Sequence, residues 1–308
     1  MSTKVVCIIN GGKKLRKHAV ETIALMKASP RLEVSIIHTE RQYHATKLAS
    51  KLDANDYDIV IAVGGDGTCN EVLNGIITTP NKPMMGIIPN GTGNDFHRML
   101  GVFNPQRFVQ ALERKTYQSI DVGCVDFEDS VRYFINIADV GFGAAVVELM
   151  DRQRKRGLKG KLSYSTAIVR SFFAYRKKLI SIQGEDFEFK GKSLMIAFCN
   201  GHTLGHGLVI HPDAELSNGQ LGITVIGDVS LLTYIRNLGN LKKGKRITHP
   251  EAHYFNGKKI KIAMSGEQLA VEGDGELFGT QPSNVFVVEN AVQLITVDPI
   301  DPKKTLEY

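Results

Sequence analysis

The sequence predicts an N-terminal parallel α/β domain followed by an antiparallel β-sandwich-like domain. In the first third of the chain, short β-branched runs alternate with longer segments of helical apolar spacing, which is typical of βαβ units. Beyond Val125, many short strand-like runs follow one another with turn residues between them, which is typical of an antiparallel sandwich or barrel. At 308 residues, the chain is also long enough for two domains.

The predicted N-terminal domain consists of buried strands and the helices that connect them. Strands are expected at 4–10, 32–38, 57–63 and 83–89, and helices at 14–28, 44–52 and 69–78. Such connections make the strands parallel, with both faces of the sheet covered. Ligands of such sheets bind beyond the carboxyl ends of the strands, which is where glycine-rich turns fall in this sequence.

The predicted C-terminal domain begins with a strand that leads into a turn at 132–143. Helices are expected at about 144–156 and 162–177, strands recur from Leu179 onward, and one helix near 230–241 interrupts them. We assign residues 1–125 to the first domain and residues 126–291 to the second. The tail, 292–308, is expected to pack back on the first domain.

Cysteine use and hydropathy indicate a protein of a reducing compartment. The four cysteines, at 7, 69, 124 and 199, form no CxxC pair, which argues against a disulfide framework or a thiolate zinc site. No run of about 18 apolar residues occurs, and the N-terminal apolar run is too short for a signal sequence. We therefore expect a cytoplasmic protein that reaches the membrane only from its inner face.

Two glycine-rich turns mark an anion site at one edge of the predicted sheet. GGDGT at 64–68 follows the third strand, and PNGTGND at 89–95 follows the fourth. Each turn precedes a helical segment, so the amide groups of two helix N-termini should point into the same space. Tight turns capped by Thr68 or Asp95 are the purely structural alternative.

The carboxylate of Asp66 lies in the middle of the first turn, where it would repel a phosphate at close range. A divalent cation between the carboxylate and the phosphates removes this conflict. Magnesium suits the role because it keeps few protein ligands and several waters. Asp66 therefore points to magnesium-bound ATP rather than to a plain dinucleotide.

A second acidic cluster comes late in the chain. Glu272, Asp274 and Glu276 alternate with glycines after the strand-like run QLAV. Asp-Gly is a strong hairpin signal, so an exposed hairpin turn explains this cluster when it is taken alone.

Together, these segments resemble the catalytic domain of the diacylglycerol kinase family. GGDGT at 64–68, PNGTGNDF at 89–96 and DGE at 274–276 agree with that family in order, spacing and position at strand ends, and family-like features cover nearly the whole chain. The resemblance implies a Rossmann-like nucleotide domain and a β-rich lipid-acceptor domain. It also implies ATP-dependent transfer of the γ-phosphate to a lipid hydroxyl, such as that of diacylglycerol.

The resemblance also assigns roles to residues. Asp274 is expected to act as general base toward the lipid hydroxyl, with Asp66 as the second catalytic carboxylate. Glu276 is expected to contact metal or nucleotide. Further ATP contacts are expected from Asn10, Gly11, Gly12, Thr39, Gly64, Gly65, Gly67, Thr68, Asn70, Gly91, Thr92 and Gly93.

A structural magnesium site of some relatives is altered in this sequence. Family members often have Asp-Asp-Gly where this chain has Ser217-Asn218-Gly219. A site made of Glu215, Asn218 and Gln220 would lack the charge of that aspartate. We expect it to be weak or absent.

Basic residues gather between Arg152 and Lys178, where ten Lys or Arg residues occur without an acid. They interleave with Phe172, Phe173 and Tyr175, a composition suited to docking on an anionic membrane surface. A solvated helix face is the alternative, and no nucleic-acid motif accompanies the cluster. We expect the lipid acceptor to be reached at the membrane through residues 152–178.

Two other functions fit parts of the sequence. A soluble NAD kinase shares the GGDGT turn, and a nucleotide-binding regulator would keep the glycine turns without catalysis. The sequence contains no readable code for the acceptor lipid, and a homodimer is compatible with it.

Overall fold

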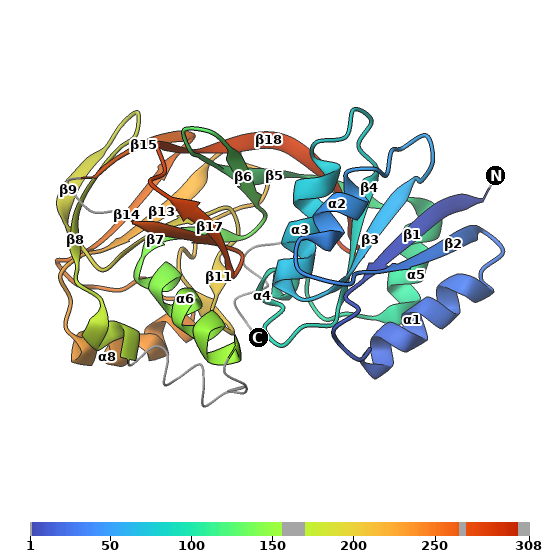
Figure 1. The fold of residues 1–308 in the computed structure, drawn as a ribbon, viewed down its shortest axis with the longest axis horizontal. Coiled ribbons are helices and arrows are strands. Elements are labelled where there is room, and N and C mark those ends of the chain that lie inside the picture. The colour runs from blue at the N-terminus through green and yellow to red at the C-terminus, as the bar shows by residue number, and fades with distance from the viewer. Residues whose placement is uncertain (1, 156–169, 265–268, 301–308) are drawn as a thin grey trace.

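The computed structural model describes residues 2–155, 170–264 and 269–300 and places them in two domains side by side (Figure 1). The N-terminal domain is α/β and the C-terminal domain is a β-sandwich, which confirms the predicted fold class. The predicted helix at 162–177 is helical at 170–174, whereas residues 162–169 lie outside the described residues, as do residues 156–161 of the basic segment 152–178. In the part of the chain that the structure describes, no helix is both long and apolar enough to cross a bilayer.

The N-terminal sheet has parallel strands in the order β2-β1-β3-β4. Alternate side chains of β1 enter two separate cores: Val5 and Cys7 pack on one face, and Val6 and Ile8 on the other. Both faces are therefore covered by helices, which is why these strands read as continuous apolar runs. The strands are β1 (Thr3–Ile9), β2 (Leu32–His38), β3 (Ile59–Gly64) and β4 (Met84–Pro89).

Helix α3 (Asp66–Ile76) begins three residues earlier than the sequence predicts. Gly65 is its N-cap residue, and Asp66 occupies the first turn, where a carboxylate suits the positive end of the helix dipole. Asp66 is thus a helix N-terminal residue rather than part of a free turn. The other helices of this domain are α1 (Lys17–Ala28), α2 (His44–Ala49), α4 (Asp95–Arg98) and α5 (Pro105–Arg114).

Antiparallel sheets face each other in the C-terminal domain. One has the order β14-β13-β10-β7-β16-β17, and the other continues the N-terminal sheet through β18, β15, β8 and β9. Their facing side chains form one core, in which Ile180 and Val285 of one sheet pack with Val140 and Ile223 of the other.

The predicted strand at 132–143 is divided between two strands and the start of a helix. Strand β6 (Val131–Phe134) and strand β7 (Ile137–Gly141) precede α6 (Phe142–Lys155), and the predicted helix near 230–241 is α8 (Leu231–Lys242). The remaining strands are β5 (Tyr117–Asp126), β8 (Lys178–Gln183), β9 (Glu188–Ser193), β10 (Met195–Cys199), β11 (Thr203–Leu204), β12 (Leu208–Val209), β13 (Leu221–Ile226), β14 (Ala252–Gly257), β15 (Lys259–Met264), β16 (Ala270–Gly273), β17 (Glu276–Thr280) and β18 (Asn284–Ile295).

Strand β18 joins the two domains and runs along the top of the molecule in Figure 1. It pairs with β15 near its start and with β4 near its end, where Leu294 lies opposite Met85. Its pairing with β5 is interrupted between Val288 and Val292, and the carboxylate of Asp121 bridges this irregularity by accepting the N–H of Asn290 at 2.8 Å. One strand therefore fixes the sandwich against the N-terminal sheet.

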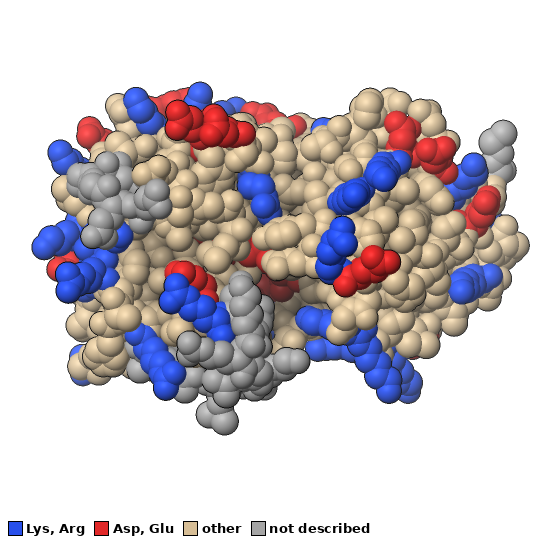
Figure 2. All heavy atoms as spheres, viewed as in Figure 1, with Lys and Arg blue, Asp and Glu red and all other residues tan. Residues whose placement is uncertain are grey.

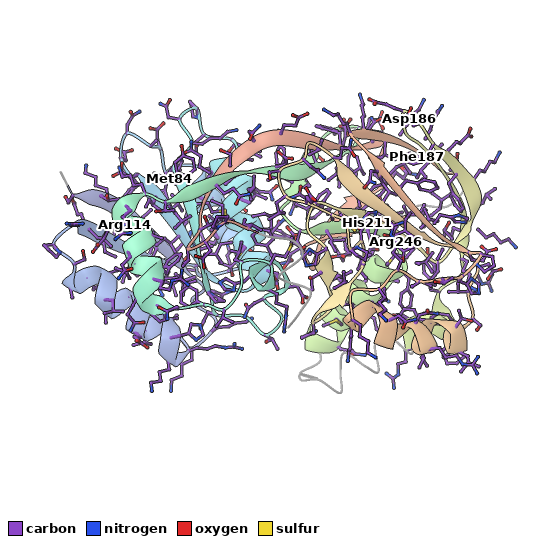
Figure 3. The ribbon with its side chains drawn as sticks, turned by 180° about the vertical axis from the view of Figure 1, so that it is seen from behind. Met84, Arg114, Asp186, Phe187, His211 and Arg246 are labelled. Atoms are coloured by element: carbon purple, nitrogen blue, oxygen red, sulfur yellow. The ribbon has the colours of Figure 1, made fainter. Side chains whose placement is uncertain are left out.

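Aromatic contacts close the far end of the sandwich. Phe187 stacks on Phe255 with ring centroids 4.5 Å apart, and Figure 3 shows Phe187 at the end of the C-terminal domain away from the N-terminal domain. His211, close to Arg246 in the same view, bonds through Nε2 to the carbonyl of Phe255 at 3.2 Å. Burial lowers the pKa of His211, so this histidine is a neutral structural residue.

Candidate active site

A cavity of about 590 Å³ lies between the two domains. The loops after β1, β2, β3 and β4 line one side, and the β16–β17 turn, α6, α8 and the second sheet line the other. Figure 2 shows acidic side chains in the recess between the domains and Lys and Arg side chains on the surface around it. The carboxyl ends of the parallel strands thus open onto a space that the sandwich shares.

The two glycine turns of the N-terminal domain lie against each other. The N–H of Asn90 donates to the carbonyl of Gly64 at 2.6 Å. A Cβ added to Gly91 would lie only 2.4 Å from the Cα of Gly65. Because only glycine allows this approach, both turns can present backbone N–H groups to one anion.

Replacing Gly91 with Ala should force these turns apart. The new Cβ would meet backbone, which cannot rotate away, so we expect a loss of about 1–3 kcal/mol in unfolding free energy and weaker ATP binding. Gly239→Ala is the matched control, because nothing lies within 4 Å of its Cβ in α8 and alanine should stabilise that helix by up to about 1 kcal/mol. Urea denaturation of both variants measures the contrast, and equal midpoints would contradict the close packing of the turns.

Side chains after the first two strands complete the N-terminal side of the cavity. The Nδ2 of Asn10 donates to Thr68 Oγ1 at 3.1 Å, and the N–H of Gly11 donates to Thr39 Oγ1 at 3.2 Å. The structure therefore brings together residues predicted from four separate turns. Of the predicted ATP contacts, Asn10, Gly12, Thr39, Gly65, Asp66, Gly67, Thr68, Gly91, Thr92, Gly93 and Glu276 line the cavity, whereas Gly11, Gly64 and Asn70 are not among its lining residues.

Asp66 faces this cavity from the first turn of α3, where it accepts the N–H of Phe96 at 3.3 Å. Burial, and after it the nearby carboxylate of Asp95, raises the pKa of Asp66. A half-buried carboxylate beside a second acid is an oxygen ligand that a divalent cation would stabilise, so the site fits Mg²⁺. Across the described residues, no three His, Cys, Asp or Glu side chains cluster as metal ligands, and water and phosphate would have to supply the remaining ligands.

Asp274 begins the turn between β16 and β17 and is buried, with 5% of its surface exposed. The turn is a hairpin, as the Asp-Gly signal indicates, in which Gly275 is exposed but Asp274 is buried. The carboxylate accepts hydrogen bonds from the N–H groups of Ile135 at 2.9 Å and Asn136 at 3.0 Å. Burial raises the pKa of Asp274 to about 6 despite these donors, so the carboxylate is ionised at neutral pH and held in one orientation.

Asn70 connects this carboxylate to the helix that carries Asp66. Its Nδ2 donates to Asp274 at 2.8 Å and to the carbonyl of Tyr133 on β6 at 2.9 Å. One helical turn later, Asn74 donates to the same carbonyl at 2.8 Å. Asn70 therefore ties α3 to the sandwich and to Asp274, a role that its position in the sequence did not reveal.

Glu276 reaches across to the N-terminus of α3. Its Oε2 accepts from Gln42 Nε2 at 2.7 Å, and a Cβ added to Gly67 would lie 2.6 Å from its Oε1. The absence of a side chain at Gly67 is what lets this carboxylate approach the N-terminus of α3.

Asp95 is a site residue that the sequence analysis treated only as a helix cap. Its carboxylate accepts the N–H groups of His206 and Gly207, both at 3.0 Å, from the loop between β11 and β12. It thus holds a loop of the sandwich at the cavity and adds negative charge next to Asp66. The GTGND motif carried the signal for this residue.

The residues predicted for a structural magnesium lie away from the cavity. Glu215, Asn218 and Gln220 are exposed, and Oδ1 of Asn218 accepts the N–H of Gln220 at 3.0 Å. The neighbouring Gly219 is instead held by Asp121, which accepts its N–H at 2.8 Å. The prediction that this site is weak or absent stays a prediction.

The part of the cavity beyond Asp274 is apolar. It is formed where α6 and α8 cover the second sheet, and most of its lining belongs to one hydrophobic cluster of aromatic and aliphatic side chains. This chamber has no signal in the sequence, because its lining comes from segments far apart in the chain. Its apolar lining includes Phe142, Val146, Met150, Leu194, Leu208, Ile210, Ile226, Val229, Tyr234, Leu241, Ile247 and Ala252.

Family models match both domains. Residues 4–125 match the diacylglycerol kinase catalytic domain, and residues 136–296 match the YegS C-terminal NAD kinase beta sandwich-like domain. These ranges follow the division between the α/β domain and the sandwich.

Individual proteins and structures are similar over nearly the whole chain. The diacylglycerol kinase of Staphylococcus haemolyticus is 30% identical over 92% of this chain and 85% of its own length. That of Staphylococcus saprophyticus is 29% identical over 96% of this chain and 95% of its own length. A solved diacylglycerol kinase structure from Bacillus anthracis has the same fold, with a TM-score of 0.70 at 21% identity over 96% of this chain and 97% of its own.

Proposed function

The chain belongs to the diacylglycerol kinase family, and from that premise we propose that it transfers the γ-phosphoryl group of ATP to a lipid hydroxyl with Asp274 as general base. Membership of the family makes it a phosphotransferase with an alcohol acceptor and a lipid kinase. One observation carries the finer proposal. A single cavity joins the glycine turns to an apolar chamber, and Asp274 is among the residues that line it.

The nucleotide would bind on the N-terminal side of this cavity. Backbone N–H groups of the turns at 64–68 and 89–95 would receive the phosphates, since the N-terminus of α3 carries partial positive charge. Residues 1–125 would then form the ATP domain, and residues 126–291 would supply the acceptor side. Asp66 would hold Mg²⁺, which when bound neutralises charge on the β- and γ-phosphates.

Asp274 would take the proton from the lipid hydroxyl while the hydroxyl oxygen attacks the γ-phosphorus. A bond forms between the lipid oxygen and the γ-phosphorus. The bond between the γ-phosphorus and the β–γ bridging oxygen breaks, and its electron pair stays on that oxygen in the departing ADP. The donors that hold Asp274 fix its orientation, and its pKa of about 6 leaves it ionised and basic enough to accept a proton at neutral pH. Positioning of the reactants and neutralisation of charge account for most of the rate enhancement of such a reaction.

The function is tested by an acceptor screen with labelled ATP and magnesium. Vesicles of diacylglycerol, ceramide, a sphingoid base or phosphatidylglycerol are compared with NAD in solution, using wild type and Asp274→Asn. Label in a lipid, and its loss in the variant, is the expected result. Label in NAD would favour a soluble NAD kinase, and ATP binding without transfer to any acceptor would favour a regulator.

The pH dependence of the reaction should follow the titration of Asp274. Because its pKa is raised to about 6, the basic form is lost as the pH falls through that value. We expect kcat/KM for the acceptor to decline about tenfold per pH unit below pH 6, whereas a carboxylate with the ordinary pKa of 3.8 would keep it flat there. Initial rates between pH 5 and 8, with ATP binding measured over the same range as control, distinguish these profiles.

We further propose that the chamber opens toward an anionic membrane. Helix α8, which helps to line the chamber, exposes Leu232 and Ile235 to solvent at 55% and 50% of their surface, one helical turn apart. Phe173 of the basic segment is exposed at 77%. Exposed cations occur on the same helix and just beyond it, at Arg236, Lys242, Lys243, Lys245 and Arg246. Apolar side chains among cations are the composition that binds anionic bilayers.

Replacing both Leu232 and Ile235 with Glu should weaken vesicle association at least about tenfold, since two apolar contacts are lost and two negative charges are introduced. Val131→Glu is the control, because Val131 is also exposed but lies on β6, on the opposite side of the molecule in Figure 1. Co-sedimentation with phosphatidylglycerol vesicles at two salt concentrations measures binding. Equal binding by the double variant and the control would exclude α8 from the docking face.

A further inference from the structure

Two buried carboxyl groups lie behind the turn that carries Asp274, and the reaction described above does not use them. Asp139 on β7 and Glu272 on β16 are directly opposite each other in an antiparallel pair. They are 0% and 1% exposed, their carboxyl groups interact with each other, and Oδ2 of Asp139 has no other hydrogen-bond partner among the described residues. Glu272 also lines the cavity.

Few groups balance the charge of this pair. Glu272 Oε2 accepts the N–H of Gly275 at 2.9 Å, and Asp139 Oδ1 accepts the N–H of Ala144 at 3.3 Å. The titratable groups that face the pair are Asp274 on the Glu272 side and Tyr175 and Cys199 on the Asp139 side. Within the described residues, no Lys or Arg forms an ion pair with either carboxyl group.

Two carboxyl groups in contact in such a place retain one proton between them. Burial raises the pKa of Asp139 to about 6 and, together with the charge of Asp139, raises the pKa of Glu272 well above its ordinary value. We assign this proton to Glu272, whose O–H would then donate to the carboxylate of Asp139, where Oδ2 has no other partner among the described residues. The other oxygen of Glu272 remains the acceptor for Gly275.

The hydrogen bond from the Gly275 N–H to Glu272 lies in the turn that carries Asp274. Asp274 and Gly275 both have left-handed backbone conformations, with φ of 51° and 84°. Asp-Gly tolerates this geometry better than most residue pairs, but left-handed backbone is still a minor conformation for aspartate, so contacts that hold the turn stabilise it. The bond from the Gly275 N–H to Glu272 is one such constraint, directly beside the residue that bears the base.

We propose that Glu272, uncharged and paired with Asp139, is a positioning residue that holds the Asp274-Gly275 turn in its active geometry. The proposal rests on the proposed role of Asp274 as base. The pair also reaches the acceptor side, since Asp139 binds the first turn of α6, and a Cβ at Gly143 would lie 1.8 Å from its Oδ2. Phe142 and Val146 of α6 line the chamber, so the pair connects the base to the helix that would contact the lipid.

Substitutions at Glu272 separate a neutral positioning group from an anion. Glu272→Gln keeps an acceptor for Gly275 and a donor for Asp139, so we expect kcat within about twofold of wild type. Glu272→Ala removes both contacts and should lower kcat about 10- to 100-fold with little change in KM for ATP. A large loss in Glu272→Gln would overturn the assignment of a neutral group, and full activity in Glu272→Ala would overturn the positioning role.

The protonation state of Glu272 can also be measured without any lipid substrate. A ¹³C NMR titration of labelled Glu side chains, assigned with Glu272→Gln, should show Glu272 protonated at pH 7 in the wild type. Asp139→Asn removes the neighbouring charge and should move that titration to lower pH. If Glu272 is ionised at pH 7 in the wild type, the proposal is wrong, and this result does not depend on whether Glu272→Ala folds. If no lipid is phosphorylated, the titration still tests the protonation state of Glu272, and only the proposed function is contradicted.

Discussion

Asp274→Asn is expected to lower kcat for lipid phosphorylation about 10²- to 10⁴-fold, the range that a positioned general base contributes. Asparagine has the size of aspartate, but its single oxygen can accept only one of the N–H groups of Ile135 and Asn136, which donate to different oxygens of Asp274, and it takes up no proton. ATP binding should change little, because the glycine turns at 64–68 and 89–95 are left intact. Steady-state rates on lipid vesicles and calorimetric titration with ATP measure the two quantities separately.

Asp186→Asn is the matched control for Asp274→Asn. Asp186 lies at the outer end of the sandwich in Figure 3, so the same change of charge there should leave kcat within about twofold of wild type. If Asp274→Asn keeps more than about a tenth of wild-type kcat, the residue is not the base. A loss of ATP binding in that variant would instead place Asp274 in the nucleotide site.

Asp66→Asn is expected to lower kcat/KM for magnesium-bound ATP about 10²- to 10³-fold. This is the loss expected when a group that stabilises charge on the transferred phosphoryl group is removed. Without metal, the effect of Asp66→Asn on ATP binding should be reversed. Burial and the Asp95 charge raise the pKa of Asp66, which shows that a further negative charge beside it is unfavourable. Asparagine removes the repulsion between Asp66 and free phosphates, so metal-free ATP should bind the variant at least as tightly as wild type.

Titration of wild type and Asp66→Asn with ATP, in magnesium and in EDTA, tests this reversal independently of turnover. Asp58→Asn is a suitable control, because Asp58 forms an ion pair with Lys115 outside the cavity. Equal losses of affinity in magnesium and in EDTA would show that Asp66 contacts the nucleotide through hydrogen bonds rather than through a cation.

The predicted strands and the glycine turns depend on local chemistry, and the structure agrees with them closely. The runs at 4–10 and 57–63 are β-branched and apolar along their whole length, which leaves a buried parallel strand as their stable state. Gly65 and Gly91 are required because two backbones touch, and such positions leave a direct trace in the sequence. The start of α3 was placed late because Asp66 reads equally well as a turn residue or as the first residue of a helix.

Other features carry no local signal. Asn70 could be predicted only as one more residue of a phosphate loop, since its bond to Asp274 joins positions 204 residues apart. The apolar chamber is assembled from α6, α8 and strands of the second sheet, and each segment alone reads as ordinary core. Asp139 looks like any acid in a strand until β7 pairs with β16 and places it against Glu272.

The sequence by itself determined the two domains, the glycine turns and the identity of the acidic residues, because apolar periodicity and turn chemistry act over a few neighbouring residues. Only the tertiary structure decided that Asp274 is buried beside α3, that a chamber lies beyond it and that Glu272 faces another acid. These features depend on β18 joining the two sheets and on strand register in the sandwich. Burial and nearby charge, which raise the pKa values of Asp66, Glu272 and Asp274, come into existence only when those distant segments meet.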